Sequence, residues 1–472
     1  MVERIKNKSL KINAFLNVLK SCSNILIPVI TYPYISRTLG AGNYGKYSFA
    51  ESVISIFLVF ASMGIPVYAV REGARIRDNQ KETVKFCSEI FSINIIALVI
   101  MILLLFMISS FVPRLRQDRI LIYMLSMNII TNVLSRDWIN SIYEDFLYTT
   151  IKYLVFQFVS VIMLLLFVKK VDDYIIYTSI VVFSNSGGYI VNFFYTKRYI
   201  PINVTWHMNL KKHIRPILYL FGISLAVQVY IRSDIAILGF LRSNEEVGIY
   251  TLSSRIYTTV KTLLNAVVMV AIPRISKHIG EKDATLYHFI LNRLHRYLYI
   301  MIFPCVTGLF FESNNIMRLI GGIEFVRGTN ALRILCFAMV FAVFGCYYSQ
   351  AVLVPNRLER CFFCATVISA MGNIGLNFIM IPYCGMEGAA ITTVISEVVV
   401  FMICYCYSIK LYSRKKNQST VPVFIGCLMI SVVCLFINQL PIDYYIQIIM
   451  SIFISVVLYF LLLLIFWKKA LK

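Results

Sequence analysis

Apolar segments of about 17 residues or more recur along almost the whole of this 472-residue chain, separated by short charged or turn-rich stretches. Hydrophobic residues make up 59% of the sequence and charged residues only 14%, whereas soluble globular chains carry about 25% charged residues. The apolar segments are continuous, without the alternation typical of a transmembrane β-barrel. The sequence therefore predicts an all-α, polytopic membrane protein.

These segments predict about 14 transmembrane helices. The first six lie at 14–36, 47–69, 86–111, 120–142, 151–168 and 174–195, and the next six at 216–240, 251–273, 297–320, 330–353, 362–384 and 388–409. A final pair lies at 421–439 and 444–467. We therefore expect an N-terminal six-helix lobe over residues 1–200, a C-terminal six-helix lobe over 201–415, and an additional transmembrane hairpin over 416–472.

The basic residues are distributed unevenly between the predicted loops. The chain has 45 Lys and Arg against 23 Asp and Glu, a formal net charge of +22. Lys and Arg are about three times as frequent in one set of alternate loops as in the other, which places the first set and both termini in the cytoplasm. Because these charges lie in short tracts between apolar segments, we interpret them as topology signals and expect no binding to nucleic acid.

A short pattern occurs once in each half of the sequence. Gly45-Lys46-Tyr47 precedes an apolar segment that ends at Pro66, and Gly248-Ile249-Tyr250 precedes a segment that ends at Pro273. Two halves in the same orientation form a parallel repeat, with the two lobes related by an axis along the membrane normal.

Three sequence blocks resemble Wzx-type polysaccharide flippases of the multidrug/oligosaccharidyl-lipid/polysaccharide exporter superfamily, and the resemblance extends over most of residues 10–410. Asp137-Trp138 is similar to the family's fourth-span motif, although Ile139-Asn140 stands where that motif has an aromatic pair. The blocks are Pro33-Tyr34…Arg37…Leu39-Gly40…Tyr44-Gly45, then Arg232-Ser-Asp234…Leu238-Gly239…Val247-Gly248…Tyr250, and Asn373…Leu376-Asn377…Pro382…Gly385…Gly388-Ala389-Ala390…Thr393…Glu397.

The resemblance implies a V-shaped, two-lobed transporter without enzymatic activity. Its cargo would be an undecaprenyl-pyrophosphate-linked oligosaccharide repeat unit, of O antigen or another surface polysaccharide, moved to the outer leaflet of the bacterial cytoplasmic (inner) membrane by alternating access. Membrane lipids, a polysaccharide polymerase and a chain-length regulator would be its partners. A multidrug or lipid II exporter of the same superfamily is the alternative, and an integral membrane polysaccharide polymerase is less favoured because the predicted external loops are short.

Ionisable residues inside predicted spans are candidate functional residues, because each costs about 2.5–3.5 kcal/mol at the bilayer centre. Arg and Lys recognise phosphate groups, and carboxylates can hold H⁺ or Na⁺ as a coupling ion. Pairing between helices, which would only fix their packing, is the alternative for Arg232 and Glu397. The candidate substrate-binding cations are Arg232, Lys261, Arg255 and Arg136, and the candidate ion-coupling or gating residues are Asp234, Glu397 and Asp137.

We expect neither a cofactor nor a metal site. The 12 cysteines are scattered, and the Cys361-Phe-Phe-Cys364 pair has no second pair or histidine nearby. Two glycine pairs, Gly321-Gly322 and Gly385…Gly388, lack the Lys-Ser/Thr of a nucleotide-binding P-loop. Without such a loop, an ion gradient or the consumption of the moved lipid would supply the energy.

Overall fold

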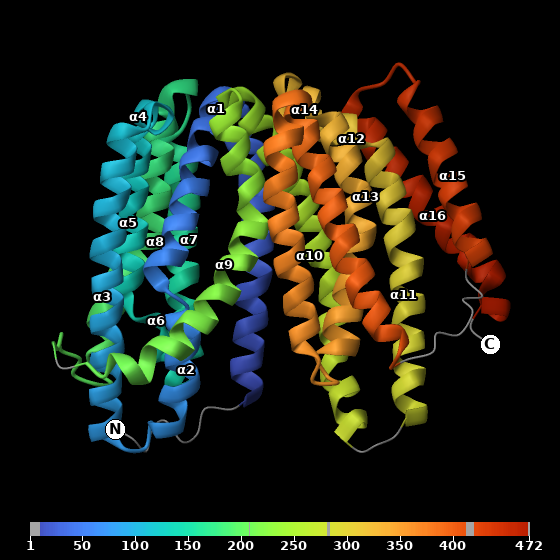
Figure 1. The fold of residues 1–472 in the computed structure, drawn as a ribbon. Helices are drawn as coiled ribbons and strands as arrows, with labels where there is room; N and C mark the ends of the chain where they lie inside the picture. Colours follow the sequence, from blue (N-terminus) through green and yellow to red (C-terminus); the bar gives the residue numbers. More distant parts are fainter. Residues whose placement is uncertain (1–9, 207, 281–283, 412–419, 471–472) are drawn as a thin grey trace. The chain divides into compact units, whose positions relative to one another are not determined.

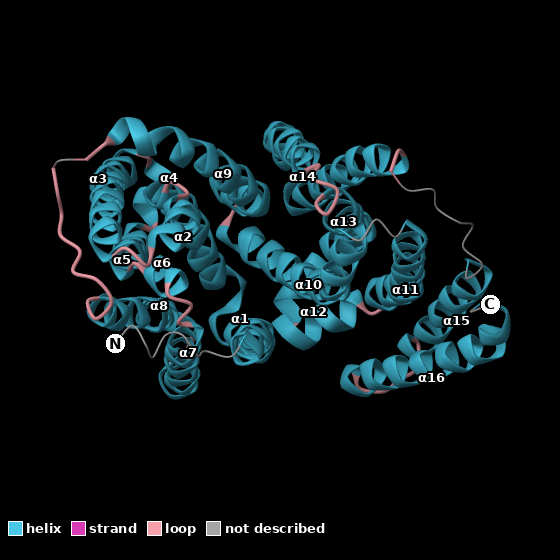
Figure 2. Cartoon of the chain, turned by 90° about the horizontal axis from the view of Figure 1, so that it is seen from below, coloured by secondary structure: helices cyan, strands magenta, loops and turns pink. Residues whose placement is uncertain are grey.

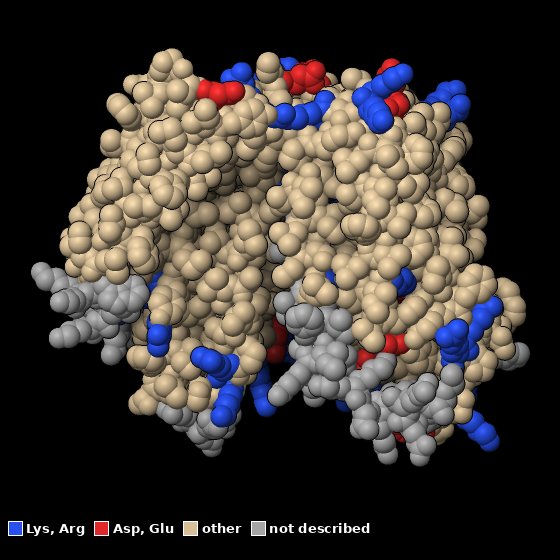
Figure 3. Space-filling view, turned by 180° about the vertical axis from the view of Figure 1, so that it is seen from behind, with Lys and Arg blue, Asp and Glu red and all other residues tan. Residues whose placement is uncertain are grey.

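The computed structural model describes residues 10–206, 208–280, 284–411 and 420–470 (Figure 1). These residues form helices joined by loops and contain no strand, which confirms the predicted all-α class. Eleven described helical segments are long and apolar enough to cross a membrane. Lys, Arg, Asp and Glu gather toward the ends of the helices, and a broad surface with few charges lies between them (Figure 3). Both features are those of a polytopic membrane protein.

The chain folds into two compact units, residues 1–236 and 237–472, with the boundary inside the helix that spans Leu210–Leu241. The predicted boundaries at 200 and 415, drawn between spans, stay predictions, as does the V shape. The first unit contains α1 (Leu10–Ser62), α2 (Ile65–Ile76), α3 (Gln80–Phe111), α4 (Pro113–Gln117), α5 (Arg119–Ser135), α6 (Asp137–Ile142), α7 (Phe146–Phe167), α8 (Tyr174–Thr196) and most of α9 (Leu210–Leu241).

The second unit is helical throughout its described part, and a π-helical turn at Tyr347–Leu353 follows α13. In Figure 2, which is seen from below, α15 of the C-terminal pair lies beside α11. The helices are α10 (Asn244–Gly280), α11 (Ala284–Phe311), α12 (Ser313–Gly321), α13 (Thr329–Cys346), α14 (Glu359–Ile409), α15 (Thr420–Asn438) and α16 (Tyr444–Ala470).

Two helices, α1 and α14, are each interrupted by a single glycine. Gly40 has φ 70° and ψ 171°, and Gly385 has φ 55° and ψ −134°. A positive φ is accessible to glycine without steric cost, so the chain turns there and continues as a second helix. Each of these long helices therefore supplies two of the predicted spans. The exact number of spans stays a prediction.

Arg242 stabilises the break in α14. Proline at 382 and the turn at Gly385 deprive nearby carbonyls of their helical partners. The Arg242 guanidinium donates to the Ile381 carbonyl through Nε at 3.1 Å and to the Pro382 carbonyl through Nη2 at 2.6 Å. A charged residue of the short connection between α9 and α10 thus completes a helix end.

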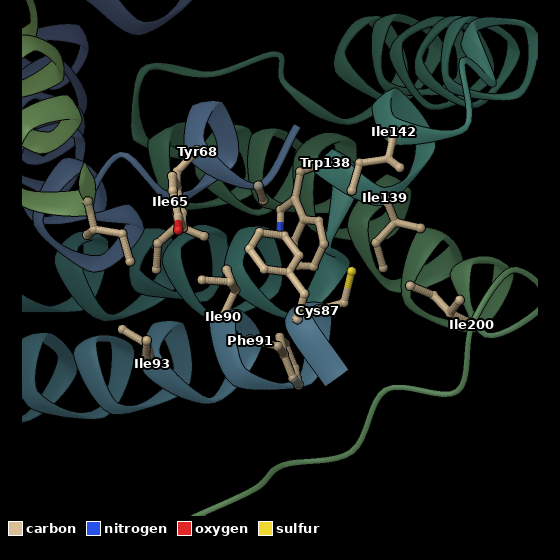
Figure 4. Close-up of a cluster of buried hydrophobic side chains, with 13 residues drawn as sticks. Ile65, Tyr68, Cys87, Ile90, Phe91, Ile93, Trp138, Ile139, Ile142 and Ile200 are labelled. Atoms are coloured by element: carbon tan, nitrogen blue, oxygen red, sulfur yellow. The ribbon is translucent and has the colours of Figure 1, made fainter. Parts of the chain in front are cut away.

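An apolar core fixes one end of the first unit (Figure 4). Residues of α2, α3, α6 and the start of α9 meet around Trp138, Ile139 and Ile90, all at most 5% exposed. Full burial of one such side chain contributes about 1.5–3 kcal/mol, so this cluster anchors four helices. Its other members include Ile65, Tyr68, Ala69, Phe86, Cys87, Phe91, Ile93, Ile142, Ile200 and Ile217.

The C-terminal hairpin packs onto the rest of the second unit. Gly426 of α15 lies so close to Tyr459 of α16 that an added Cβ would be 2.4 Å from the ring. The Tyr459 hydroxyl donates to the Ile300 carbonyl of α11 at 2.9 Å. This hydrogen bond satisfies the buried hydroxyl and attaches the hairpin to α11.

Candidate functional site

The charged residues of α10 and α14 form one cluster in the second unit. Tyr257 and Lys261 are four residues apart on α10, so both point from one face of that helix. The Tyr257 hydroxyl donates to Glu397 Oε1 at 2.8 Å, and Lys261 Nζ lies 3.1 Å from the same oxygen. The ammonium also lies 4.6 Å from the centre of the Tyr257 ring. Glu397, in the middle of the second part of α14, therefore has two donors.

This cluster is largely removed from solvent. The side chain of Glu397 is 8% exposed and that of Lys261 is 22% exposed. Removing one partner of such a pair strands a charge, whereas the complete pair carries no net charge. Sequence analysis selected both residues but did not predict that they pair with each other. Tyr257 was missed, because nothing in the sequence distinguishes it from the other 29 tyrosines.

A second intramembrane pair lies in the first unit. Arg232 of α9 approaches Glu51 of α1, with 3.6 Å between Nη2 and Oε1. Their side chains are 20% and 24% exposed. Sequence analysis missed Glu51, although a carboxylate inside the predicted span 47–69 was a usable signal. Arg232 and Glu397 therefore have different partners: Arg232 pairs with Glu51, and Glu397 pairs with Lys261.

Asp234 and Arg255 lie near these pairs in sequence but are placed differently. Asp234 is two residues from Arg232, which turns it to another side of α9, and it is 7% exposed. Arg255 is partly buried on α10, six residues before Lys261. Their roles in ion coupling and substrate binding stay predictions.

Arg136 breaks the predicted span 120–142. It adopts the left-handed conformation, with φ 53° and ψ 40°, between α5 and α6, so the long helix ends at Ser135. Its side chain is buried, donates to the Phe193 carbonyl at 3.1 Å and lies over the rings of Phe91 and Phe193. These contacts fix Arg136 in the packing of the first unit. Substrate contact by Arg136 stays a prediction.

Asp137, at the start of α6, pairs with a lysine of α7. Lys152 Nζ lies 2.9 Å from Asp137 Oδ1, and the lysine side chain is 8% exposed. Next to this pair, Asp145 accepts hydrogen bonds from Tyr195 at 2.7 Å and from Tyr199. Burial, followed by this carboxylate, raises the pKa of Tyr199, so its hydroxyl remains a donor. The Asp137–Lys152 ion pair and the hydrogen bonds to Asp145 therefore both stabilise the turn between α6 and α7.

A buried histidine connects α9 with α2 and α3. Tyr68 OH lies 2.9 Å from His213 Nδ1, and His213 Nε2 lies 2.9 Å from Glu89 Oε2. Glu89 also accepts from the Asn209 backbone N–H at 3.3 Å. Sequence analysis did not select His213, which lies outside the predicted spans.

The residues that the structure describes include no group of three His, Cys, Asp or Glu side chains placed to hold a metal ion. All twelve cysteines are free thiols, including Cys361 and Cys364.

The fold and these intramembrane charges define a polytopic helical membrane protein with buried ionisable clusters. Residues 10–278, more than half of the chain, match the family described as "Polysaccharide biosynthesis protein". The chain belongs to this family. The predicted resemblance is therefore confirmed at the level of the family.

Two named relatives match parts of the sequence. The "Putative O-antigen transporter" of Escherichia coli (strain K12) is 24% identical over 272 residues, which cover 57% of this chain and 65% of that protein. The "Probable low-salt glycan biosynthesis flippase Agl15" of Haloferax volcanii is 27% identical over 177 residues, which cover 37% of this chain and 36% of that protein. The chain thus matches less than two thirds of either relative's length.

Two solved structures share the fold at low sequence identity. A lipid II flippase MurJ in an inward closed conformation superposes with a TM-score of 0.76 at 15% identity, covering 98% of this chain and 100% of that one. An inward-facing multidrug resistance MATE family transporter of the MOP superfamily gives a TM-score of 0.59 at 13% identity, covering 81% of this chain and 94% of that one. These likenesses describe the fold alone.

Proposed function

We propose that this chain is a flippase that moves lipid-linked oligosaccharides across the membrane, and that it is not an enzyme. The observation that carries the proposal is the family match over residues 10–278, together with relatives named as an O-antigen transporter and a glycan flippase. The cargo is an undecaprenyl-pyrophosphate-linked repeat unit. The site of action is the bacterial cytoplasmic membrane, with both termini in the cytoplasm.

In this proposal the two paired cations recognise the pyrophosphate. Arg232 offers a planar fork to phosphate oxygens and Lys261 a point charge. In the described structure each lies near a carboxylate, Glu51 or Glu397, so a phosphate must replace that partner. Arg255 and Arg136 add positive charge, and the polymerase and chain-length regulator act on the moved lipid afterwards.

The carboxylates supply the coupling step. A proton bound to Glu397 would remove its negative charge and release Lys261 to the pyrophosphate, and loss of that proton would restore the pair. Asp234 and Asp137 are two further carboxylates that can bind H⁺ or Na⁺ or control the opening of the transport path. This step links ion binding to cargo binding through groups that lie 3.1 Å apart.

The experiment is deletion of the gene in the source cells, followed by complementation. Wild type should restore surface glycan, whereas Arg232→Ala and Lys261→Ala should not, when each variant is expressed to the same amount in the membrane as wild type. Lys261→Arg should restore more than Arg232→Lys, because a point charge is easier to replace than a bidentate fork.

Two results would refute the proposal. Unaltered surface glycan in the deletion strain would exclude the glycan flippase. Lysis with loss of peptidoglycan precursor export would favour the lipid II exporter instead.

A further inference from the structure

We propose that a polar pocket inside the first unit binds one sugar ring of the lipid-linked cargo. The inference rests on the flippase function proposed above and adds where the glycan is recognised. The pocket has a volume of about 190 Å³ and is lined by residues of α1, α5 and α8. Its polar lining residues are Tyr47, Glu51, Ser55, Asn128, Asn185 and Tyr189.

The lining residues form polar stripes near the middle of their helices. Tyr47, Glu51 and Ser55 are spaced by four residues on α1, and Asn185 and Tyr189 are spaced by four on α8. Residues four apart share one face of a helix. The two stripes therefore line the same pocket from facing helices, and Asn128 extends the polar lining from α5.

The two amides of the pocket have hydrogen-bonding capacity to spare. The Asn185 side chain is exposed and makes no hydrogen bond within the described residues. Asn128 accepts from the Ser186 hydroxyl at 3.1 Å through Oδ1, and its amide nitrogen has no acceptor in the same part of the chain. A primary amide in hydrocarbon without partners is costly, so both positions require a polar environment. A ligand with hydroxyl groups would supply it.

The charge and shape of the lining favour a neutral, hydroxyl-rich ring. The lining contains one carboxylate, Glu51, and neither Lys nor Arg, so the pocket does not attract the negatively charged pyrophosphate. Asn side chains both donate and accept, as sugar hydroxyls do. The half-buried Tyr189 adds a ring face for the apolar side of a sugar. These features distinguish the pocket from the cationic positions assigned to the pyrophosphate.

The test compares two lipids on the purified full-length chain in nanodiscs. One is undecaprenyl pyrophosphate, and the other is the oligosaccharide lipid that accumulates in source cells when the gene is deleted. Asn185→Leu keeps the side-chain volume and removes the amide. It should weaken binding of the oligosaccharide lipid by about three- to tenfold and leave binding of undecaprenyl pyrophosphate unchanged.

Ser179→Ala is the matched control, because Ser179 also lies on α8 but its hydroxyl bonds the Ile175 carbonyl and does not line the pocket. It should bind both lipids as wild type does. If Asn185→Leu does not fold, Asn185→Ala removes the same amide.

The outcomes separate the two proposals. Wild-type affinity for both lipids in the Asn185 variants, or no preference of wild type for the oligosaccharide lipid, would overturn the sugar pocket alone. Failure of any lipid to accumulate in the deletion strain would overturn the flippase function itself.

Discussion

The pair formed by Lys261 and Glu397 should behave as one energetic unit. The perturbation is a double-mutant cycle with Lys261→Met, Glu397→Gln and the combined variant. Both groups lie in a largely water-excluded cluster. Removing one of them therefore leaves the charge of the other without its main partner and with little water to replace it. Removing both leaves no stranded charge.

The expected magnitudes follow from burial and hydrogen bonding. Lys261→Met leaves the Glu397 carboxylate with the Tyr257 hydroxyl alone, which should cost about 3 kcal/mol. Glu397→Gln keeps an acceptor for both donors and should cost about 2 kcal/mol. The double variant should also cost about 2 kcal/mol or less, so the coupling between the two sites is about 3 kcal/mol.

The assay is thermal unfolding of the purified full-length chain, in which 1 kcal/mol corresponds to a shift of about 2–4 °C in Tm for a unit of this size. The matched control is the pair Arg327–Glu245 in the same unit. The distance between Arg327 Nη1 and Glu245 Oε1 is shorter, at 2.6 Å, but the side chain of Arg327 is 64% exposed and that of Glu245 is 49% exposed. Its cycle should give a coupling of about 0–1 kcal/mol. Additive effects of Lys261→Met and Glu397→Gln, within about 0.5 kcal/mol, would refute the reasoning.

Three further predictions test the first unit and the topology. Gly64→Ala should cost about 2 kcal/mol of unfolding free energy in a denaturant titration, because φ is 67° and the new Cβ would lie 2.6 Å from Phe221 N; unchanged stability would contradict this packing. His213→Phe should cost about 2–3 kcal/mol of unfolding free energy, because it removes the histidine partner of the buried Glu89 carboxylate. A loss of stability below about 0.5 kcal/mol would contradict this stabilising role of His213. In a cysteine-depleted chain in intact cells, an impermeant maleimide should label Ser243→Cys and spare Asp78→Cys, and the reverse pattern would overturn the predicted orientation.

The sequence alone predicted the all-α class and most helices, because an apolar segment of sufficient length leaves a membrane chain few alternatives. It did not predict where long helices bend. The predicted spans 14–36 and 47–69 are joined by a single residue with positive φ, Gly40, inside α1, and Gly385 plays the same role in α14. A glycine in an apolar segment is equally compatible with close packing, so the pattern alone does not identify the bend.

Single charged residues could be selected from the sequence, but their partners could not. Lys261 and Glu397 are 136 positions apart, and only the packing of α10 against α14 brings them together.

The helix break at Arg136 could not be predicted from the sequence either. The left-handed backbone of Arg136 ends α5, although the surrounding residues continue an apolar pattern, and its guanidinium contacts aromatic rings of α3 and α8. Such long-range compensation is absent from local sequence patterns.

The most direct measurement of the central claim is transport by the purified chain in proteoliposomes that contain the oligosaccharide lipid from the deletion strain. An impermeant reagent that oxidises sugar diols reports which lipids face outward. The account predicts that wild-type chain makes the inner-leaflet pool accessible over time, and that Lys261→Ala abolishes this transfer. An inner pool that stays protected in the presence of folded wild-type chain, under imposed H⁺ and Na⁺ gradients, would contradict the claim.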